Sequence, residues 1–433
     1  MAGRSKVLVA VLGTVVLAAP LMATASQAGP APAEWSPVTR LAPRAQSQAL
    51  AVDGRGTFTA VWTTSSWPQQ VVAARRPAGG SWSAPRVLGR GYAPVVEADT
   101  RGRVTVVWLS RRPDFTDAVL AARRPVDGPW SAPVRLTRDK SVPGYPVDGE
   151  EPYGAAQVDL AVSPRGAAVV TWTWGSDERA VPWRIQAAIR PAAGSWSAPR
   201  DVTAAGPLRH PDVDIAGDGT ATLIYGRQPL GEPQAVLARR RVPGVGWTKP
   251  VRVAAEGYAH TVAVDRAGDA VVAYSPDFSR VKARYRPASG GWQPARTLSP
   301  AGAEISDFAL AMNGPGRTVV AMGRSGGRVD LATRTPGTSW SAPELVAGPG
   351  EPLAEVVAAL NGRGDLYVGW GCYALFGKYR PAGDTWSNRF TVSPDSGVEV
   401  LESVDAVVAP DGDAAVLWDQ EALPLKVRVL SVP

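Results

Sequence analysis

The sequence predicts an all-β fold, a β-propeller of eight four-stranded blades, and three observations lead to this prediction. The chain of 433 residues contains 45 Gly and 40 Pro, too many helix breakers for a mainly helical protein. A turn glycine recurs eight times, most often 48 residues apart. A tryptophan, usually in Trp-Ser-Ala-Pro, also recurs eight times. A period of this length with four strands is typical of a propeller blade.

The turn glycines mark the hairpin between the first two strands of each repeat. They are Gly56, Gly102, Gly166, Gly219, Gly268, Gly316, Gly364 and Gly412. Six residues after each glycine stands a large apolar or aromatic side chain: Trp62, Trp108, Trp172, Tyr225, Tyr274, Met322, Trp370 or Trp418. Eight copies of both features indicate blade architecture, with the large side chain in the core.

Each repeat is expected to supply four short strands, which we name A to D. In the first repeat these are residues 50–53, 57–63, 71–76 and 82–88. The strands are rich in Val and aromatic residues, and Gly, Pro, Asp and Asn separate them. Strand B alternates, so Phe58, Ala60 and Trp62 share one side of the sheet.

The two ends of the repeat series predict how the ring closes. Residues 403–432 supply strands A, B and C of an eighth repeat, and the segment 35–41 reads as a strand D without a blade. Pairing these segments would complete the C-terminal blade and remove two exposed sheet edges. We therefore expect eight blades, with seven as the fallback if two repeats merge.

An arginine stands six residues before seven of the eight strand D tryptophans, as in Arg76 and Trp82. The two residues bracket the C–D hairpin, so a guanidinium can reach the indole face across the turn. Two readings follow: a basic ring on one face of the molecule, or a repeated structural clamp. Seven copies favour the clamp.

The first residues predict a secretory signal peptide at 1–28, followed by a single propeller domain at 29–433. Arg4 and Lys6 precede an apolar run at 7–21 and a small-residue cleavage site. That run is shorter than the ~20 residues of a membrane span. We therefore expect a secreted, extracellular protein without a membrane anchor. Cys372 is the sole cysteine, so the chain has no internal disulfide.

The turn between strands C and D carries a family resemblance. The segment from Arg76 to Pro85, Arg-Pro-Ala-Gly-Gly-Ser-Trp-Ser-Ala-Pro, resembles the BNR repeat, or Asp-box, of sialidase-like propellers, whose pattern is Ser-x-Asp-x-Gly-x-x-Trp. The glycine three residues before the tryptophan is kept at Gly79, Gly244, Gly337 and Gly383, whereas the Ser and Asp of the box are absent. The resemblance implies a secreted β-propeller with degenerate repeats. It transfers no catalytic residue, because the early Arg-Ile-Pro segment of sialidases is missing.

The irregular loops of the predicted blades all fall on the face that the B–C and D–A loops share. Aromatic side chains with neighbouring carboxylates and arginines suit sugar rings or a protein partner. Longer loops whose aromatics pack on themselves are the alternative. The candidate ligand-binding residues, in blades 1 to 3, are Trp67, Arg111, Asp114, Phe115, Tyr145, Tyr153, Trp174, Asp177 and Trp183.

The sequence points to binding rather than catalysis. His210 and His260 begin neighbouring blades, but no metal-ligand motif surrounds them, and we expect ordinary loop histidines, no metal and no cofactor. A net charge of +7 comes without any nucleic-acid motif, so no nucleic-acid partner is expected. The leading hypothesis is a secreted, non-catalytic, monomeric propeller that binds a glycan or an extracellular protein. The alternatives are a sialidase-like glycoside hydrolase or other carbohydrate-active enzyme, and a purely structural envelope protein.

Overall fold

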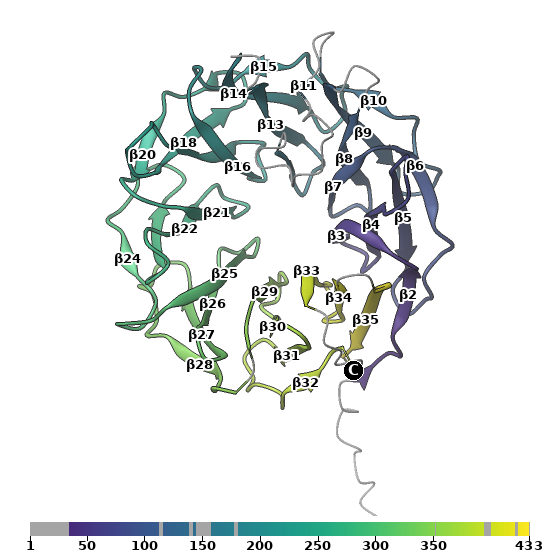
Figure 1. Cartoon of the computed structure of the whole chain (residues 1–433), viewed down its shortest axis with the longest axis vertical. Helices are drawn as coiled ribbons and strands as arrows, with labels where there is room; N and C mark the ends of the chain where they lie inside the picture. The colour runs from purple at the N-terminus through teal and green to yellow at the C-terminus, as the bar shows by residue number, and fades with distance from the viewer. Residues whose placement is uncertain are drawn as a thin grey trace, which may run out of the picture.

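The molecule is a ring of eight antiparallel sheets, which confirms the predicted eight-bladed propeller (Figure 1). The computed structural model describes residues 34–111, 116–137, 142–143, 157–176, 181–350, 352–393, 400–420 and 423–432. Every regular element in these ranges is a β-strand. No helix among them is long and apolar enough to span a membrane.

In each blade the strands follow one another from the centre of the ring outward, as Figure 1 shows. Blades 1 and 2 contain β3 (Ala45–Val52), β4 (Phe58–Thr64), β5 (Gln70–Arg76), β6 (Arg86–Arg90), β7 (Tyr92–Ala98), β8 (Val104–Arg111), β9 (Thr116–Arg124), β10 (Val134–Arg135) and β11 (Val142–Pro143). Blades 3 and 4 contain β12 (Val158–Val162), β13 (Ala168–Ser176), β14 (Val181–Arg190), β15 (Arg200–Asp201), β16 (Leu208–Ile215), β17 (Ala221–Arg227), β18 (Ala235–Val242), β19 (Gly246–Trp247) and β20 (Val251–Ala254).

The other half of the ring repeats the same pattern. Blades 5 and 6 contain β21 (Ala259–Val264), β22 (Ala270–Ser275), β23 (Lys282–Arg286), β24 (Arg296–Thr297), β25 (Ile305–Met312), β26 (Thr318–Arg324), β27 (Arg328–Arg334) and β28 (Glu344–Ala347). Blades 7 and 8 contain β29 (Glu355–Leu360), β30 (Leu366–Gly371), β31 (Leu375–Arg380), β32 (Phe390–Thr391), β33 (Leu401–Val408), β34 (Ala414–Gln420), β35 (Leu425–Ser431), β1 (Glu34–Trp35) and β2 (Thr39–Ala42).

Blade 8 contains both ends of the described chain, as predicted. Strand β35 pairs antiparallel with β1, where Trp35 lies opposite Leu430, and with β2, where Thr39 lies opposite Val427. The N-terminal segment therefore supplies the outer strand of the C-terminal blade. Because β34 pairs with one side of β35 and the N-terminal segment pairs with the other, β35 is not left as an open sheet edge.

The residues that define the repeat have the structural roles expected of them. All eight turn glycines have positive φ, between 76° and 105°, a region that L side chains rarely adopt. The large residue six positions later is buried in every blade. The apolar side chains form eight clusters, and each cluster joins two adjacent blades. The hydrophobic core is therefore inter-blade packing repeated around the ring.

Strand D is shorter than the sequence suggested. In blade 1 regular pairing begins at Arg86, whereas the prediction began at Trp82. The Ser83 amide donates to the Arg75 carbonyl, and the Arg75 amide donates to the Ser83 hydroxyl at 3.1 Å. A side chain thus replaces one ladder partner ahead of Pro85, which has no N–H to donate. The Trp-Ser-Ala-Pro motif therefore precedes the regular strand and is bonded to strand C through the serine side chain.

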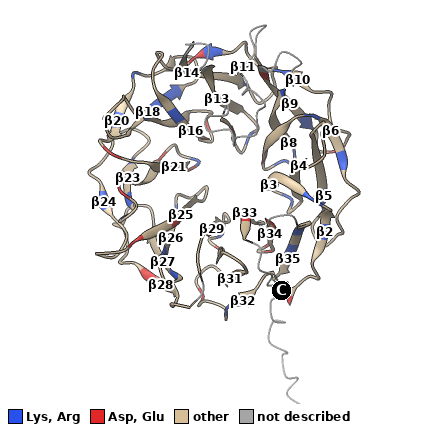
Figure 2. Cartoon of the chain, in the orientation of Figure 1, with Lys and Arg blue, Asp and Glu red and all other residues tan. Residues whose placement is uncertain are grey.

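The arginine clamps form in part as predicted. Arg190 lies over the Trp196 ring at 5.3 Å and Arg380 over the Trp386 ring at 4.4 Å. Arg76 packs over Phe58 of its own blade instead. Basic and acidic residues are both spread around the ring, and no single arc collects the arginines (Figure 2).

Candidate functional site

The face built by the B–C and D–A loops, which we call the loop face, holds all the exposed aromatic side chains of the described residues. These are Trp67, Tyr258, Phe278 and Tyr373, with 76%, 39%, 54% and 43% of their surface exposed. They belong to blades 1, 5 and 7. The strand D tryptophans, in contrast, are half-buried and pack against the inter-blade hydrophobic clusters. The two faces therefore differ in the exposure of their aromatic side chains, and only the loop face offers exposed aromatic rings to a ligand among the described residues.

Tyr258 and Phe278 form a stacked aromatic pair on blade 5. Their ring centroids are 6.0 Å apart with 23° between the planes. Both are tied to Ser275 at the end of β22: the Tyr258 amide donates to its carbonyl, and the Phe278 amide to its hydroxyl. Phe278 has a φ of 55°, which is rare for a bulky residue. Such a conformation in an exposed aromatic residue is often found at functional sites.

His210, His260 and Gln157 connect three neighbouring blades beside this pair. The Gln157 side chain donates to His210 Nδ1 at 2.8 Å and accepts from the His210 amide at 2.6 Å. His260 Nε2 donates to the His210 carbonyl at 2.9 Å. The rings meet edge to face at 6.2 Å. The two histidines therefore hold strands β12, β16 and β21 together at the loop face.

Burial governs the charge of both histidines. It lowers the pKa of His210, and Arg209 lowers it further. Burial lowers the pKa of His260 to about 4. Both rings are therefore neutral at physiological pH. Among the described residues no group of three or more His, Cys, Asp or Glu side chains is placed to hold a metal ion.

Tyr92, Asp117 and Arg111 form a polar cluster on blade 2. The Tyr92 hydroxyl donates to Asp117 at 2.6 Å, and Arg111 Nε lies 3.4 Å from the same carboxylate. Arg111 also lies over the Tyr92 ring at 5.5 Å. Burial raises the pKa of Asp117, while Tyr92 and Arg111 stabilise its ionised form. An acid, a phenol and a guanidinium at one place could bind a polar ligand or assist proton transfer.

The structure describes four of the nine residues that the sequence singled out. Trp67 is exposed in the B–C loop of blade 1, and Arg111 belongs to the cluster on blade 2. Trp174 and Trp183 share the β13–β14 hairpin of blade 3. The five others lie outside the described residues: Asp114, Phe115, Tyr145, Tyr153 and Asp177.

The two tryptophans of blade 3 are half-buried within their hairpin. Arg184 lies over the Trp174 ring at 5.1 Å. A Cβ at Gly175 would come within 2.6 Å of the Trp183 backbone. The two strands of the hairpin can therefore lie this close only because residue 175 has no side chain. Both rings thus have partners within the blade, unlike Trp67.

A belt of carboxylates lies on the innermost strands, around the centre of the ring. Glu97, Asp159, Asp214, Glu355 and Asp405 belong to β7, β12, β16, β29 and β33. Burial, together with the charges of Asp214 and Asp405, raises the pKa of Glu97 to about 8. Because carboxylates of blades 4 and 8 affect one in blade 2, these side chains influence one another across the centre.

Sequence reasoning missed Tyr258 and Phe278. Neither recurs from blade to blade, and the loop that carries Phe278 is short, so no spacing anomaly marks it. One signal was available: a phenylalanine within the turn sequence Ser-Pro-Asp-Phe-Ser, where no strand pattern needs an aromatic ring. The histidine pair was noticed, but the contact between the two blades depends on the fold.

Comparisons with known proteins identify the fold. No known protein family matches the sequence, and no curated protein matches it either. The structure is similar to the BP39L lectin from Burkholderia pseudomallei, with a TM-score of 0.56 and 15% identity, over 81% of this chain and 100% of the lectin. The polysaccharide lyase Uly1 aligns with a TM-score of 0.49 and 12% identity, over 90% of this chain and 91% of the lyase.

The Aleuria aurantia lectin aligns with a TM-score of 0.42 and 12% identity, over 83% of this chain and 99% of that chain. At such identities the likeness to solved structures concerns the β-propeller fold alone. Propellers serve many functions, so the function must be argued from the site.

Proposed function

We propose that this chain is a secreted, non-catalytic β-propeller with degenerate Asp-box-like repeats that binds a glycan through its loop face. The observation that carries the proposal is the confinement of the exposed aromatic residues to that face. Flat apolar rings with polar neighbours are the surfaces on which sugar rings stack. The propeller fold shared with a lectin over 81% of the chain is consistent with this function.

The Tyr258–Phe278 pair is the proposed centre of the glycan site. Hydrogen bonds to Ser275 fix the backbone of both residues, so little backbone freedom is lost when a ligand binds. Trp67 and Tyr373 supply further exposed rings on blades 1 and 7 of the same face. A ring of separate contacts would favour a ligand with several sugar units.

A glycan array with the purified protein tests the proposal. We expect binding to a subset of glycans, and we expect Tyr258→Ala with Phe278→Ala to weaken it at least tenfold. Val245→Ala is the matched control, because Val245 is an exposed apolar residue in a C–D turn on the opposite face. If the array shows no binding, or if the variant with Tyr258→Ala and Phe278→Ala binds as the wild type does, the glycan proposal is wrong.

The alternative of a carbohydrate-active enzyme is favoured by one observation, the Tyr92–Asp117–Arg111 cluster. An acid next to a phenol and a guanidinium is a plausible proton-transfer site. Fluorogenic glycosides, sialosides included, distinguish the two functions. Turnover that survives purification and disappears in Asp117→Asn would establish the enzyme and overturn the non-catalytic proposal.

A further inference from the structure

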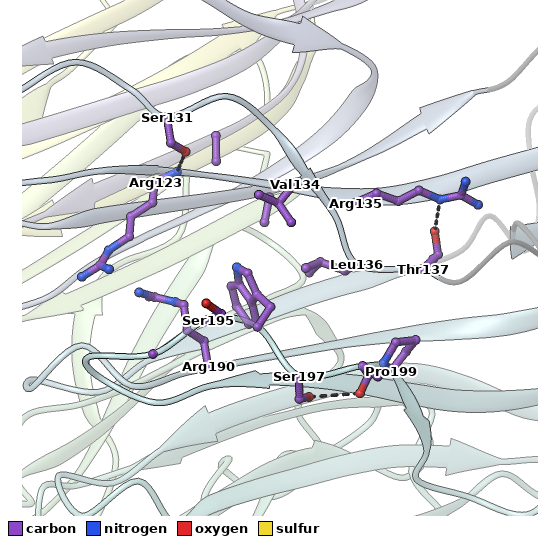
Figure 3. A pocket seen from close by; sticks show the side chains of 15 residues that line it. Arg123, Ser131, Val134, Arg135, Leu136, Thr137, Arg190, Ser195, Ser197 and Pro199 are labelled. Atoms are coloured by element: carbon purple, nitrogen blue, oxygen red, sulfur yellow. Dashed lines mark hydrogen bonds between the residues drawn. The ribbon is translucent and has the colours of Figure 1, made fainter.

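A second site lies between blades 2 and 3, near the C–D turns and away from the loop face (Figure 3). Strands β9 and β10 form one wall of this cavity, and the segment 194–199 between β14 and β15 forms the other. Its volume is about 560 Å³, which is enough for a sugar ring. We call it the inter-blade pocket.

Two guanidinium groups line the inter-blade pocket with nitrogen atoms that have no partner. Arg190 is only 4% exposed, and its Nη2 donates to Thr105 Oγ1 at 3.1 Å. Its Nε and Nη1, and the Nε of Arg123, are buried without a hydrogen-bond partner among the described residues. Figure 3 shows both guanidinium groups at the same end of the pocket. Buried donors of this kind normally have an acceptor, so these nitrogen atoms are available to the oxyanion of a ligand.

The nearest carboxylate is already occupied. Asp99 forms an ion pair with Arg103 and also accepts the Arg101 and Arg103 amides at 2.9 and 3.0 Å. Among the described residues, Arg103, Arg123 and Arg190 therefore share this one carboxylate, and a net positive charge remains. Burial and the charges of Arg123 and Arg103 lower the pKa of Arg190 to about 10, which still leaves it protonated at neutral pH.

The inter-blade pocket also has an apolar part, beside the hydroxyls of Ser131, Thr137, Ser195 and Ser197. Trp196, Val134 and Leu136 line this part, and Arg190 lies over the Trp196 ring at a centroid distance of 5.3 Å. A ligand that fits both ends needs an oxyanion for the arginines and a ring with an apolar face for the tryptophan. An acidic sugar has both features.

We propose that the inter-blade pocket binds a carboxylate-bearing sugar of the uronic acid class, with its carboxylate on Arg123 and Arg190 and its ring against Trp196. The site is independent of the proposed loop-face function, because no residue is shared between them. Its free arginine donors would then be satisfied by the ligand rather than by the protein.

The equivalent position in blade 1 supplies a matched control. Arg75 occupies the strand position of Arg123, but it has a carboxylate partner in its own blade, Asp53, at 3.6 Å. Arg75→Gln removes one positive charge at the strand position that is equivalent to Arg123. It should leave the inter-blade pocket intact.

Isothermal titration calorimetry of the purified chain with D-glucuronate tests the proposal. We expect binding that weakens about tenfold or more in Arg123→Gln and is unchanged in Arg75→Gln, since a buried charge-assisted hydrogen bond is lost only in the first. Methyl glucoside, which lacks the carboxylate, should bind at least tenfold more weakly than glucuronate.

Three results would overturn the proposal. One is a failure of glucuronate to bind the folded wild-type chain, and another is an equal loss in Arg75→Gln and Arg123→Gln. The third is competition by inorganic sulfate as effective as that by glucuronate, which would show that the sugar ring contributes nothing. Circular dichroism of each variant confirms that loss of binding is not loss of folding.

Discussion

The carboxylate of Asp405 on β33 accepts a hydrogen bond of 2.7 Å from the backbone amide of Leu50 on β3, and so joins blade 8 to blade 1 across the closure of the ring. The same relationship links Asp159 to the Val213 amide at 2.6 Å. The innermost strand of each blade is a sheet edge, and the amides on its unpaired side have no strand partner. The aspartates of the belt, Asp159, Asp214 and Asp405, accept from amides of the next blade, so these three have a structural role.

Removing the acceptor at the ring closure should destabilise the whole domain. We expect Asp405→Ala to lower the free energy of unfolding by about 1–3 kcal/mol, because the Leu50 amide loses its acceptor in a buried place. Urea unfolding followed by tryptophan fluorescence at pH 5 measures the loss. Asp405→Asn keeps a side-chain carbonyl and should cost much less. Equal stability of Asp405→Ala and the wild type would show that the hydrogen bond is not structural.

The belt predicts that its contribution to stability falls as the pH rises from 4.5 to about 8. Glu97 has a pKa of about 8 in the fold against 4.5 in a free side chain. Between these values the unfolded chain binds fewer protons than the native state. The stabilising contribution of Glu97 is therefore fully present below pH 4.5 and is lost as the pH rises through 8. Asp214 and Glu355, with pKa values of about 7, add to the same loss.

Glu97→Gln isolates this effect, because glutamine has the shape of the protonated acid. We expect the variant to match the wild type near pH 5 and to be more stable by roughly 2 kcal/mol at pH 9. This value is smaller than the pKa shift of Glu97 alone would give, because a half-buried carboxylate is still partly solvated by water. Urea unfolding at pH 5, 7 and 9 gives the comparison, and parallel pH curves for the two proteins would contradict it.

His260 predicts a pH effect of the opposite sign in the acid range. Its pKa falls from 6.5 to about 4 on folding, so its neutral form stabilises the native state fully above pH 6.5, and that contribution disappears as the pH falls to 4. His260→Gln should therefore gain stability relative to the wild type by roughly 2 kcal/mol between pH 7 and pH 4.5. NMR titration of the imidazole checks the cause directly: a native pKa near 6.5 would refute it.

The repeat made the architecture predictable from the sequence. Gly56 and Trp62 have counterparts in all eight blades, and averaging over eight copies removes the ambiguity of any single strand. The inward carboxylates carried a similar signal that was not used. Asp159 and Asp405 both stand seven residues before the turn glycine of their blade. Their role depends on the amide of the next blade, and only the closed ring reveals it.

The candidate sites were less predictable, because each depends on one copy of a feature. Tyr258 and Phe278 lie in different loops of blade 5, and their stacking follows from the hairpin geometry. The inter-blade pocket combines Arg190, one of the seven repeated arginines, with Arg123, which sequence reasoning did not single out. Its charge excess is visible only when the blades are packed, since Asp99 is already paired with Arg103.

Ring closure by the N-terminal segment gives the last prediction, and Trp35 is the residue that tests it. Trp35 lies edge to face with Tyr367 at 6.2 Å and with Phe390 at 5.8 Å, and Arg428 lies over its ring at 5.4 Å. Trp35→Ala removes these contacts and should lower the free energy of unfolding by about 2–4 kcal/mol. The measurement is urea unfolding at pH 7.

The local consequence distinguishes ring closure from a general loss of core. If the segment closes the ring, Trp35→Ala should expose β35 to limited proteolysis before the other blades unfold, because that strand loses its outer partner. Trp35→Phe keeps an aromatic ring and should remain close to the wild type in both stability and cleavage. Early cleavage elsewhere in the ring, with β35 protected, would mean that the N-terminal strand does not hold blade 8 together.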